Sequence, residues 1–190
     1  LYTNLKKLES WVESEKNLVN KAILHSLLAR EYSDYMRHNR QQLSDRTALD
    51  VDEAPADIRE WSTNLFVAKV DEHNLASLKD SVRLLEVSSE KYVPFVKLED
   101  GSRFYGHDMY HLLAARAVDT YQLLDGFQVD TLQRARINSV YTNMINAYRH
   151  RVGAEDAVVL ATLDYWKWKS TGGSISREPY TTYRERKERL

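Results

Sequence analysis

The segment HDMYH, residues 107–111, contains the residue types of a zinc-dependent hydrolase. Two histidines four residues apart on a helix can ligate one metal ion, and an acid after the first can activate a metal-bound water. A zinc-protease helix has Glu at that second position and takes a third ligand from elsewhere. Here the acid is Asp108, one methylene shorter, and the next histidine is His150. A metal site at His107 and His111 is therefore an alternative rather than the main interpretation.

The same segment is better explained as the beginning of a buried helix. Gly106 precedes it, and Asp108 is a residue type that caps helices. The apolar residues that follow at helical spacing are Met109, Leu112, Leu113, Ala117, Tyr121 and Leu124. With Asp108 as the cap, His107 lies outside the helix and not one turn below His111. We therefore expect a structural role for Asp108, no catalytic residues, and no metal or other cofactor.

Two further charged residues fall on helix faces that are otherwise apolar. Glu31 lies in the broad apolar face of a helix predicted over 17–42, and Arg116 in that of a helix predicted over 108–125. A buried charge is costly unless it is paired, so each is expected to have a partner. The two could pair with each other, and we predict structural roles for both.

The remaining candidate sites have simpler explanations. His25 lies in the same apolar face as Glu31 and is interpreted as a hydrogen-bonded core histidine. His38 is too far along that helix to share a metal ion with it. The carboxylates of DVDE, residues 50–53, lack the glycine and alternating ligands of an EF-hand loop. In WKWK, residues 166–169, the two tryptophans cannot both be centred on one helix face, so one of them could be exposed.

Composition excludes several classes of function. The chain has 27 Lys and Arg residues against 28 Asp and Glu residues, so no overall positive field would attract nucleic acid. It has no cysteine, which excludes thiol nucleophiles, disulfides and cysteine-ligated zinc. It contains no G-x-S-x-G, P-loop or G-x-G-x-x-G motif. No apolar run approaches the ~18 residues that a membrane span needs. The sequence thus predicts a protein that is not an enzyme, with no nucleic-acid partner and no transmembrane segment.

Six glycines, three prolines and long stretches at helical period predict an all-α fold. We expect helices over residues 2–14, 17–42, 62–86, 88–94, 108–125, 130–152, 155–169 and from 179 onward. Residues 95–105 form either a small hairpin or an irregular loop. Seven or eight antiparallel helices would pack as an α/α superhelix of TPR-like hairpins or as an irregular bundle. The prediction is one domain over 1–190, with 170–178 as a linker before the last helix, and both chain ends suggest a fragment of a longer protein.

Three segments together resemble the N-terminal helical region of large bacterial alpha-2-macroglobulin-like proteins. They are KAILHSLLAREYSDYMRHNR at 21–40 with RT at 46–47, DIREW with a following helix and ASL at 57–78, and SRFYGHDMYHLLAARAVDTY at 102–121. In that family the third segment reads approximately Tyr-x-Pro-Thr-Leu-Tyr-Asp-Phe-Leu-Ala-His-Arg-Ala-x-Asp-Phe-Tyr. The matching residues are Tyr105, Tyr110, Leu113, Ala114, Arg116, Ala117, Asp119 and Tyr121. On this alignment His107 and His111 stand where the family has Pro and Asp, and Asp108 stands where it has Thr, another capping residue.

The resemblance implies an extracytoplasmic protein of the periplasm or bacterial cell surface, usually anchored as a lipoprotein, whose helical part precedes macroglobulin sandwich domains. Such proteins are thought to entrap proteases, some through a thioester between Cys and Gln. Because this chain has no cysteine, that chemistry cannot reside in it. We expect a non-catalytic scaffold or protein-interaction domain, whose partners are other domains of the same chain and, through the full-length protein, proteases. The alternatives are a helical zinc-dependent hydrolase using His107 and His111, and a free-standing TPR-like peptide-binding module.

Overall fold

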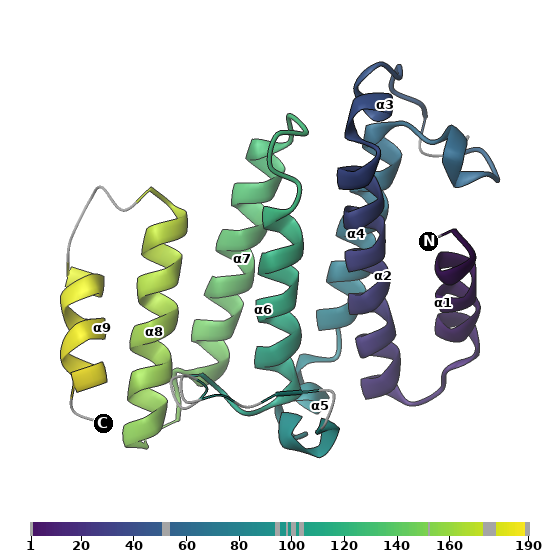
Figure 1. Ribbon diagram of the computed structural model, residues 1–190. Helices are drawn as coiled ribbons and strands as arrows, with labels where there is room; N and C mark the ends of the chain where they lie inside the picture. The colour runs from purple at the N-terminus through teal and green to yellow at the C-terminus, as the bar shows by residue number, and fades with distance from the viewer. Residues whose placement is uncertain are drawn as a thin grey trace. The chain divides into compact units, whose positions relative to one another are not determined.

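The computed structural model describes residues 2–50, 54–93, 96–97, 99, 102, 105–151, 153–172 and 178–188. Within these ranges the fold is all-α, as predicted, and contains no strand. The α-helices are α1 (Tyr2–Ser14), α2 (Leu18–His38), α3 (Arg40–Ser44), α4 (Thr63–Leu78), α5 (Ser81–Leu85), α6 (Met109–Gln122), α7 (Asp130–Tyr148), α8 (Ala154–Ser170) and α9 (Glu178–Glu188), shown in Figure 1. Two short 3₁₀ helices cover Ile58–Glu60 and Ser89–Tyr92. None of the described helices is long and apolar enough to cross a bilayer.

Two of the predicted long helices are divided in the structure. The helix predicted over 17–42 ends at His38 and resumes as α3, and the one predicted over 62–86 ends at Leu78 and resumes as α5. The second break falls at Lys79 and Asp80, and Ser81 begins α5. Asp and Ser side chains favour helix ends over helix interiors. The prediction of one continuous helix over 62–86 was therefore wrong, and Val82, beyond the break, is 74% exposed.

The chain divides into two compact units. Unit 1 comprises Leu1–Arg83 and Asp119–Asp130, and unit 2 comprises Leu84–Val118 and Thr131–Leu190, so the boundary falls inside α6. The single domain over 1–190 stays a prediction. The predicted hairpin or loop at 95–105 and the predicted linker at 170–178 lie largely outside the described residues.

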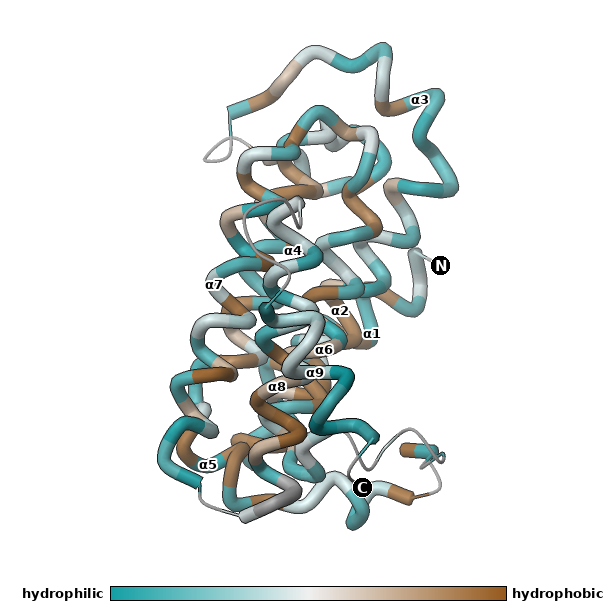
Figure 2. The backbone as a smooth tube through the Cα atoms, turned by 90° about the vertical axis from the view of Figure 1, so that its left-hand side faces the viewer, coloured by the Kyte–Doolittle hydropathy of each residue, from teal (hydrophilic) through white to brown (hydrophobic). Residues whose placement is uncertain are grey.

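In unit 1, α1 and α4 each run antiparallel to α2 (Figure 1). Helix α2 begins where it does because the Asn17 side chain accepts hydrogen bonds from the backbone N–H groups of Val19 and Asn20, at 3.0 and 3.1 Å. Along α2 and α4, hydrophobic residues recur at intervals between hydrophilic ones (Figure 2). Each of these helices therefore has an apolar stripe to bury.

The core of unit 1 is built around Tyr32, whose side chain is 1% exposed. Its ring stacks on Trp61 and on His73, with ring centroids 5.9 and 5.7 Å apart, and tilts against Phe66. Its hydroxyl group donates a hydrogen bond to Glu9 on α1. One tyrosine of α2 thus contacts α1, α4 and the segment before α4, combining a large apolar area with a satisfied polar tip.

In unit 2, α8 and α9 are antiparallel neighbours (Figure 1). The rings of Tyr165 and Tyr183 stack across them with centroids 4.6 Å apart. Before α6, an isolated β-bridge joins Ser88 and Asp108. The N–H of Ser89 donates to the carbonyl of His107, and the N–H of Met109 donates to that of Val87, both at 2.8 Å. These two bonds fix the segment HDMYH at the start of α6.

Candidate functional site

Asp108 immediately precedes α6 and is 6% exposed. Its Oδ1 accepts a hydrogen bond from the backbone N–H of His111 at 2.8 Å, and its own carbonyl accepts one from Leu112. This is the geometry of a helix N-cap, which satisfies an N–H group that has no partner inside the helix. His107 therefore lies outside the helix.

The second carboxylate oxygen of Asp108 is directed at the end of α7. Tyr148, which is fully buried, donates its hydroxyl proton to Oδ2 of Asp108, and Nη1 of Arg151 lies 3.5 Å from the same oxygen. The Arg151 guanidinium also lies over the Tyr148 ring, 4.3 Å from its centroid. Burial, aided by the hydrogen bond to Asp108, raises the pKa of Tyr148 far above its usual value. The phenol is thus a fixed donor and not a proton carrier near neutral pH.

His111, which is 3% exposed, is held as a neutral ring. The backbone N–H of Gly106 donates to its Nδ1 at 3.1 Å, so the proton of the neutral ring resides on Nε2. Its ring also meets those of Tyr105 and Tyr148 edge-on. Burial lowers the pKa of His111 to about 4, and the neighbouring His107 and Arg151 side chains act in the same direction. At neutral pH this imidazole therefore accepts a hydrogen bond from the backbone and packs against the two tyrosine rings.

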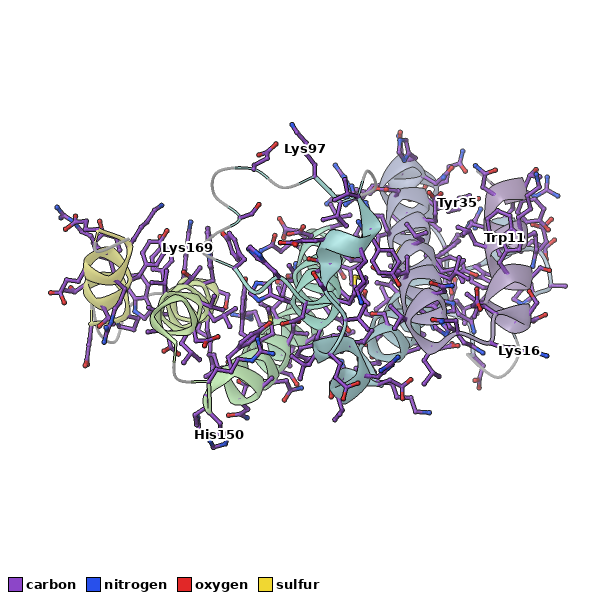
Figure 3. All side chains as sticks on the ribbon, turned by 90° about the horizontal axis from the view of Figure 1, so that it is seen from below. Trp11, Lys16, Tyr35, Lys97, His150 and Lys169 are labelled. Atoms are coloured by element: carbon purple, nitrogen blue, oxygen red, sulfur yellow. The ribbon has the colours of Figure 1, made fainter. Side chains whose placement is uncertain are left out.

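The two histidines of HDMYH are engaged with different partners. Nδ1 of His107 lies 3.3 Å from the Glu90 carboxylate, and its Nε2 lies 3.1 Å from the carbonyl of Ser102. The next histidine, His150, is exposed and projects outward beyond the end of α7 (Figure 3). Across the described ranges, no three His, Asp or Glu side chains form a group that could hold a metal ion. In the part of the chain that the structure describes, His107 and His111 therefore contact different groups and do not form one ligand set.

A depression of about 220 Å³ opens beside this cluster. It is lined by Tyr105, Gly106, His107, Tyr148, Arg151, Asp156 and Val159. Pockets for small-molecule ligands usually measure about 300 to 1,000 Å³. The depression therefore has room for ordered water or a small polar group but is below the usual size for a substrate.

Glu31 and Arg116 are both half-buried. Glu31 was expected inside a buried apolar face, so its partial exposure lowers the cost of its charge and the need for a partner. The two residues belong to different units, Glu31 to unit 1 and Arg116 to unit 2. Their pairing stays a prediction.

His25 is half-buried, and its partner is another histidine. Its Nδ1 lies 2.9 Å from Nδ1 of His73, which is 7% exposed, so one ring donates and the other accepts. Burial lowers the pKa of both, that of His73 to about 4. His38, in contrast, contacts the carbonyl of Asp34 within its own helix. His25 and His73 join α2 to α4.

The tryptophans of WKWK are both half-buried, so neither is the exposed residue that the sequence suggested. Lys169 lies over the ring of Trp166, and Trp168 packs on Tyr165. Among the described residues, Nε1 of Trp168 is buried without a hydrogen-bond partner.

The sequence reasoning missed Tyr148 and Arg151 as partners of Asp108. YRHR, residues 148–151, has the composition of a basic helix end and gives no local sign that its tyrosine is buried. Their contact with Asp108 spans 40 and 43 residues. A helical period in the sequence predicts which residues of a helix are buried, but not which buried residues of different helices contact one another.

No protein-family model, curated protein or solved structure matches this chain. The resemblance to alpha-2-macroglobulin-like proteins therefore rests on the three sequence segments alone and stays a proposal.

Proposed function

We propose that this chain is a non-catalytic helical scaffold or protein-interaction domain of a macroglobulin-like surface protein. The observation that carries the proposal is the use of the Asp108 side chain, whose two oxygens bind the N-terminus of α6 and the hydroxyl group of Tyr148. A carboxylate that activates a metal-bound water must have an oxygen directed at that water. Asp108 instead stabilises the contact between two helix ends.

The surface of unit 1 carries side chains suited to protein contact. Trp11 on α1 is 54% exposed, and Leu18 at the start of α2 is 51% exposed. Tryptophan is strongly enriched among the residues that dominate protein–protein binding energy. Figure 3 labels Trp11 on α1, the first helix of the chain. These residues support an interaction role more directly than any group of polar side chains supports catalysis.

The family resemblance supports the location and partners of the proposed domain. A helical region of this kind precedes macroglobulin sandwich domains in proteins outside the cytoplasm, so the nearest partners are domains of the same polypeptide. Proteases are partners of the whole protein, and the lack of cysteine leaves the thioester chemistry to other domains.

The decisive experiment begins with the coding sequence on either side of this chain. The proposal predicts a secretion signal before it and successive β-sandwich domains after it. The purified sandwich domain that follows should bind the chain in isothermal titration calorimetry. Trp11→Ala should weaken that binding without lowering the melting temperature, whereas Val82→Ala, an exposed apolar truncation on α5, should leave it unchanged. A gene product with no sandwich domains would contradict the proposal.

The zinc-hydrolase alternative is tested separately by metal analysis of the purified protein. The proposal predicts no stoichiometric zinc in the wild-type chain or in a His107→Ala, His111→Asn double variant. Stoichiometric zinc that disappears in the double variant would overturn the non-catalytic assignment. A gene product that ends near this chain and binds short peptides would instead favour the free-standing TPR-like module.

A further inference from the structure

A second depression, of about 250 Å³, lies wholly within unit 1. It is formed by α3, the segment after α3, the first residue of α4 and the turn that follows α6. The lining residues are Arg40, Leu43, Ser44, Arg46, Thr63, Gly126, Phe127 and Gln128. The two arginines are the charged residues in this lining, which contains no carboxylate. Its electrostatic character is therefore positive.

Arg40 is held in place by the turn at Gly126. Its Nη2 donates to the carbonyl of Gly126 at 2.9 Å, and its guanidinium lies over the ring of Phe127. Gly126 has φ of +78°, and a Cβ atom at this position would lie 2.2 Å from Nη2 of Arg40. The glycine thus both permits the turn and makes room for the guanidinium. Arg40 is positioned before any ligand arrives, which lowers the entropic cost of binding.

Arg46 is the second positive group. It is half-buried, and its Nη1 donates to the carbonyl of Trp61 at 2.7 Å. Neither Arg40 nor Arg46 forms an ion pair within the described residues; the partners of both are neutral carbonyls and an aromatic ring. Two acids adjoin lining residues in the sequence: Asp45, which lies 3.2 Å from the hydroxyl of Ser44, and Asp125, which precedes Gly126. Each guanidinium has five N–H donors, so most of these donors are left for a ligand.

The polar groups around the arginines favour the same kind of ligand. Thr63 is the first residue of the 16-residue helix α4, and the Ser62 side chain before it makes no capping hydrogen bond to the helix. The first N–H groups of a helix have no partner inside it and carry a partial positive charge. Gln128, exposed at the rim, adds a side-chain amide without a partner among the described residues.

We propose that this depression, the Arg40–Arg46 pocket, binds a phosphate group, either as free phosphate or as a phosphate monoester. Two unneutralised guanidinium groups match a dianion better than the single charge of a carboxylate. Arginine also recognises phosphate through paired N–H···O bonds. This binding site goes beyond the proposed scaffold function and does not depend on it.

The test is a titration of the ¹⁵N-labelled chain at constant ionic strength, followed by amide chemical shifts. We expect saturable shifts at Ser44, Thr63, Gly126 and Gln128 with inorganic phosphate, and affinity lower by about tenfold for acetate, which has one charge fewer. Glycerol 3-phosphate distinguishes the two sources. Tighter binding of the ester assigns the site to a phosphate monoester, and binding of inorganic phosphate alone assigns it to free phosphate. The absence of saturable shifts with either compound overturns the proposal.

Variants separate a built site from general attraction to positive charge. Gln128→Glu, at an exposed residue, adds a negative charge to the pocket at little cost in stability and should abolish phosphate binding. Arg46→Gln should weaken binding by about tenfold or more, because a charge-assisted hydrogen bond is lost. Asn4→Asp on α1 makes the same change in net charge as Gln128→Glu outside the lining and should leave affinity unchanged. Equal effects of Gln128→Glu and Asn4→Asp would contradict a site at this place.

Discussion

Tyr148, at the last residue of α7, donates its hydroxyl proton to Asp108, the cap of α6, across 40 residues of sequence. One carboxylate thereby satisfies a helix N-terminus and a buried phenol at the same time. Buried polar groups are costly when unpaired, so this contact stabilises unit 2 only while both partners are present. Asp108, the residue that made HDMYH resemble a catalytic motif, thus links the start of α6 to the end of α7.

Acid should destabilise the chain through His111. Burial lowers its pKa from 6.5 to about 4. Between these two pH values the imidazole is protonated in the unfolded chain but neutral in the folded chain. The contribution of His111 to the free energy of unfolding is therefore fully present above pH 6.5 and is lost as the pH falls toward 4. The loss from this residue is on the order of 3 kcal/mol. Urea denaturation at a series of pH values between 7 and about 4.5 measures it.

The control for this titration is His111→Asn. The asparagine oxygen replaces Nδ1 as acceptor for the Gly106 N–H but does not titrate in this range. This variant should be less stable at pH 7 because the site loses ring volume, yet its stability should fall less steeply with acid. His150→Asn, at an exposed position, should keep the wild-type slope. An unchanged slope in His111→Asn would refute the assignment of a neutral buried ring.

Asn74 should be replaceable by leucine with a gain in stability. Its side chain is 1% exposed on α4, and both its oxygen and its nitrogen are buried without hydrogen-bond partners in the described part of the chain. Leucine has the same branched outline and leaves no polar group unpaired. We expect the free energy of unfolding to rise by about 1 kcal/mol, measured by chemical denaturation.

A matched substitution shows whether that gain is specific. Asn64 is also on α4, but its side chain donates to the carbonyl of Leu49 at 2.6 Å and accepts from the hydroxyl of Ser62. Asn64→Leu should cost about 1 to 2 kcal/mol, because both partners lose their hydrogen bonds. If Asn74→Leu is as damaging as Asn64→Leu, Asn74 has a polar partner that the structure does not reveal.

Gly126 and Gly172 provide a paired test of how Arg40 is positioned. Both have positive φ, +78° and +96°, but a Cβ atom at Gly172 would meet nothing within 4 Å. Gly172→Ala should cost about 1 kcal/mol from backbone strain alone. Gly126→Ala should cost more, because Arg40 must also move. The additional destabilisation caused by Gly126→Ala should vanish when Arg40 is also replaced by alanine. Equal losses of stability for the two glycine substitutions would argue against the close contact between Gly126 and the Arg40 guanidinium.

The fold class was predictable because the helices carry a clear apolar period, and the beginning of α6 was predictable because Asp108 precedes a long apolar pattern. The break between α4 and α5 was missed, since neither Lys79 nor Asp80, the two residues between them, is strongly unfavourable inside a helix. The partners of Asp108 were not predictable from local pattern. A tyrosine in a basic helix end has the same appearance whether it faces solvent or a buried carboxylate.

The histidines illustrate the same limit. His25 was expected to be a hydrogen-bonded core residue, but nothing in the sequence around it indicates His73 as the partner. Likewise, the Arg40–Arg46 pocket depends on Gly126, a residue 86 positions from Arg40. Contacts between distant segments follow from how helices pack and are not encoded in the spacing of any one segment.

A double-mutant cycle between Asp108 and Tyr148 tests the structural role of HDMYH most directly. Asp108→Asn keeps a capping side chain but removes the charge, and Tyr148→Phe removes only the hydroxyl group. Urea denaturation of both single variants and the double variant should give a coupling free energy of about 1 to 3 kcal/mol. As a control, a cycle between Asp108→Asn and Tyr165→Phe, on α8, should give no coupling free energy. Coupling below about 0.3 kcal/mol between Asp108 and Tyr148 would contradict the account.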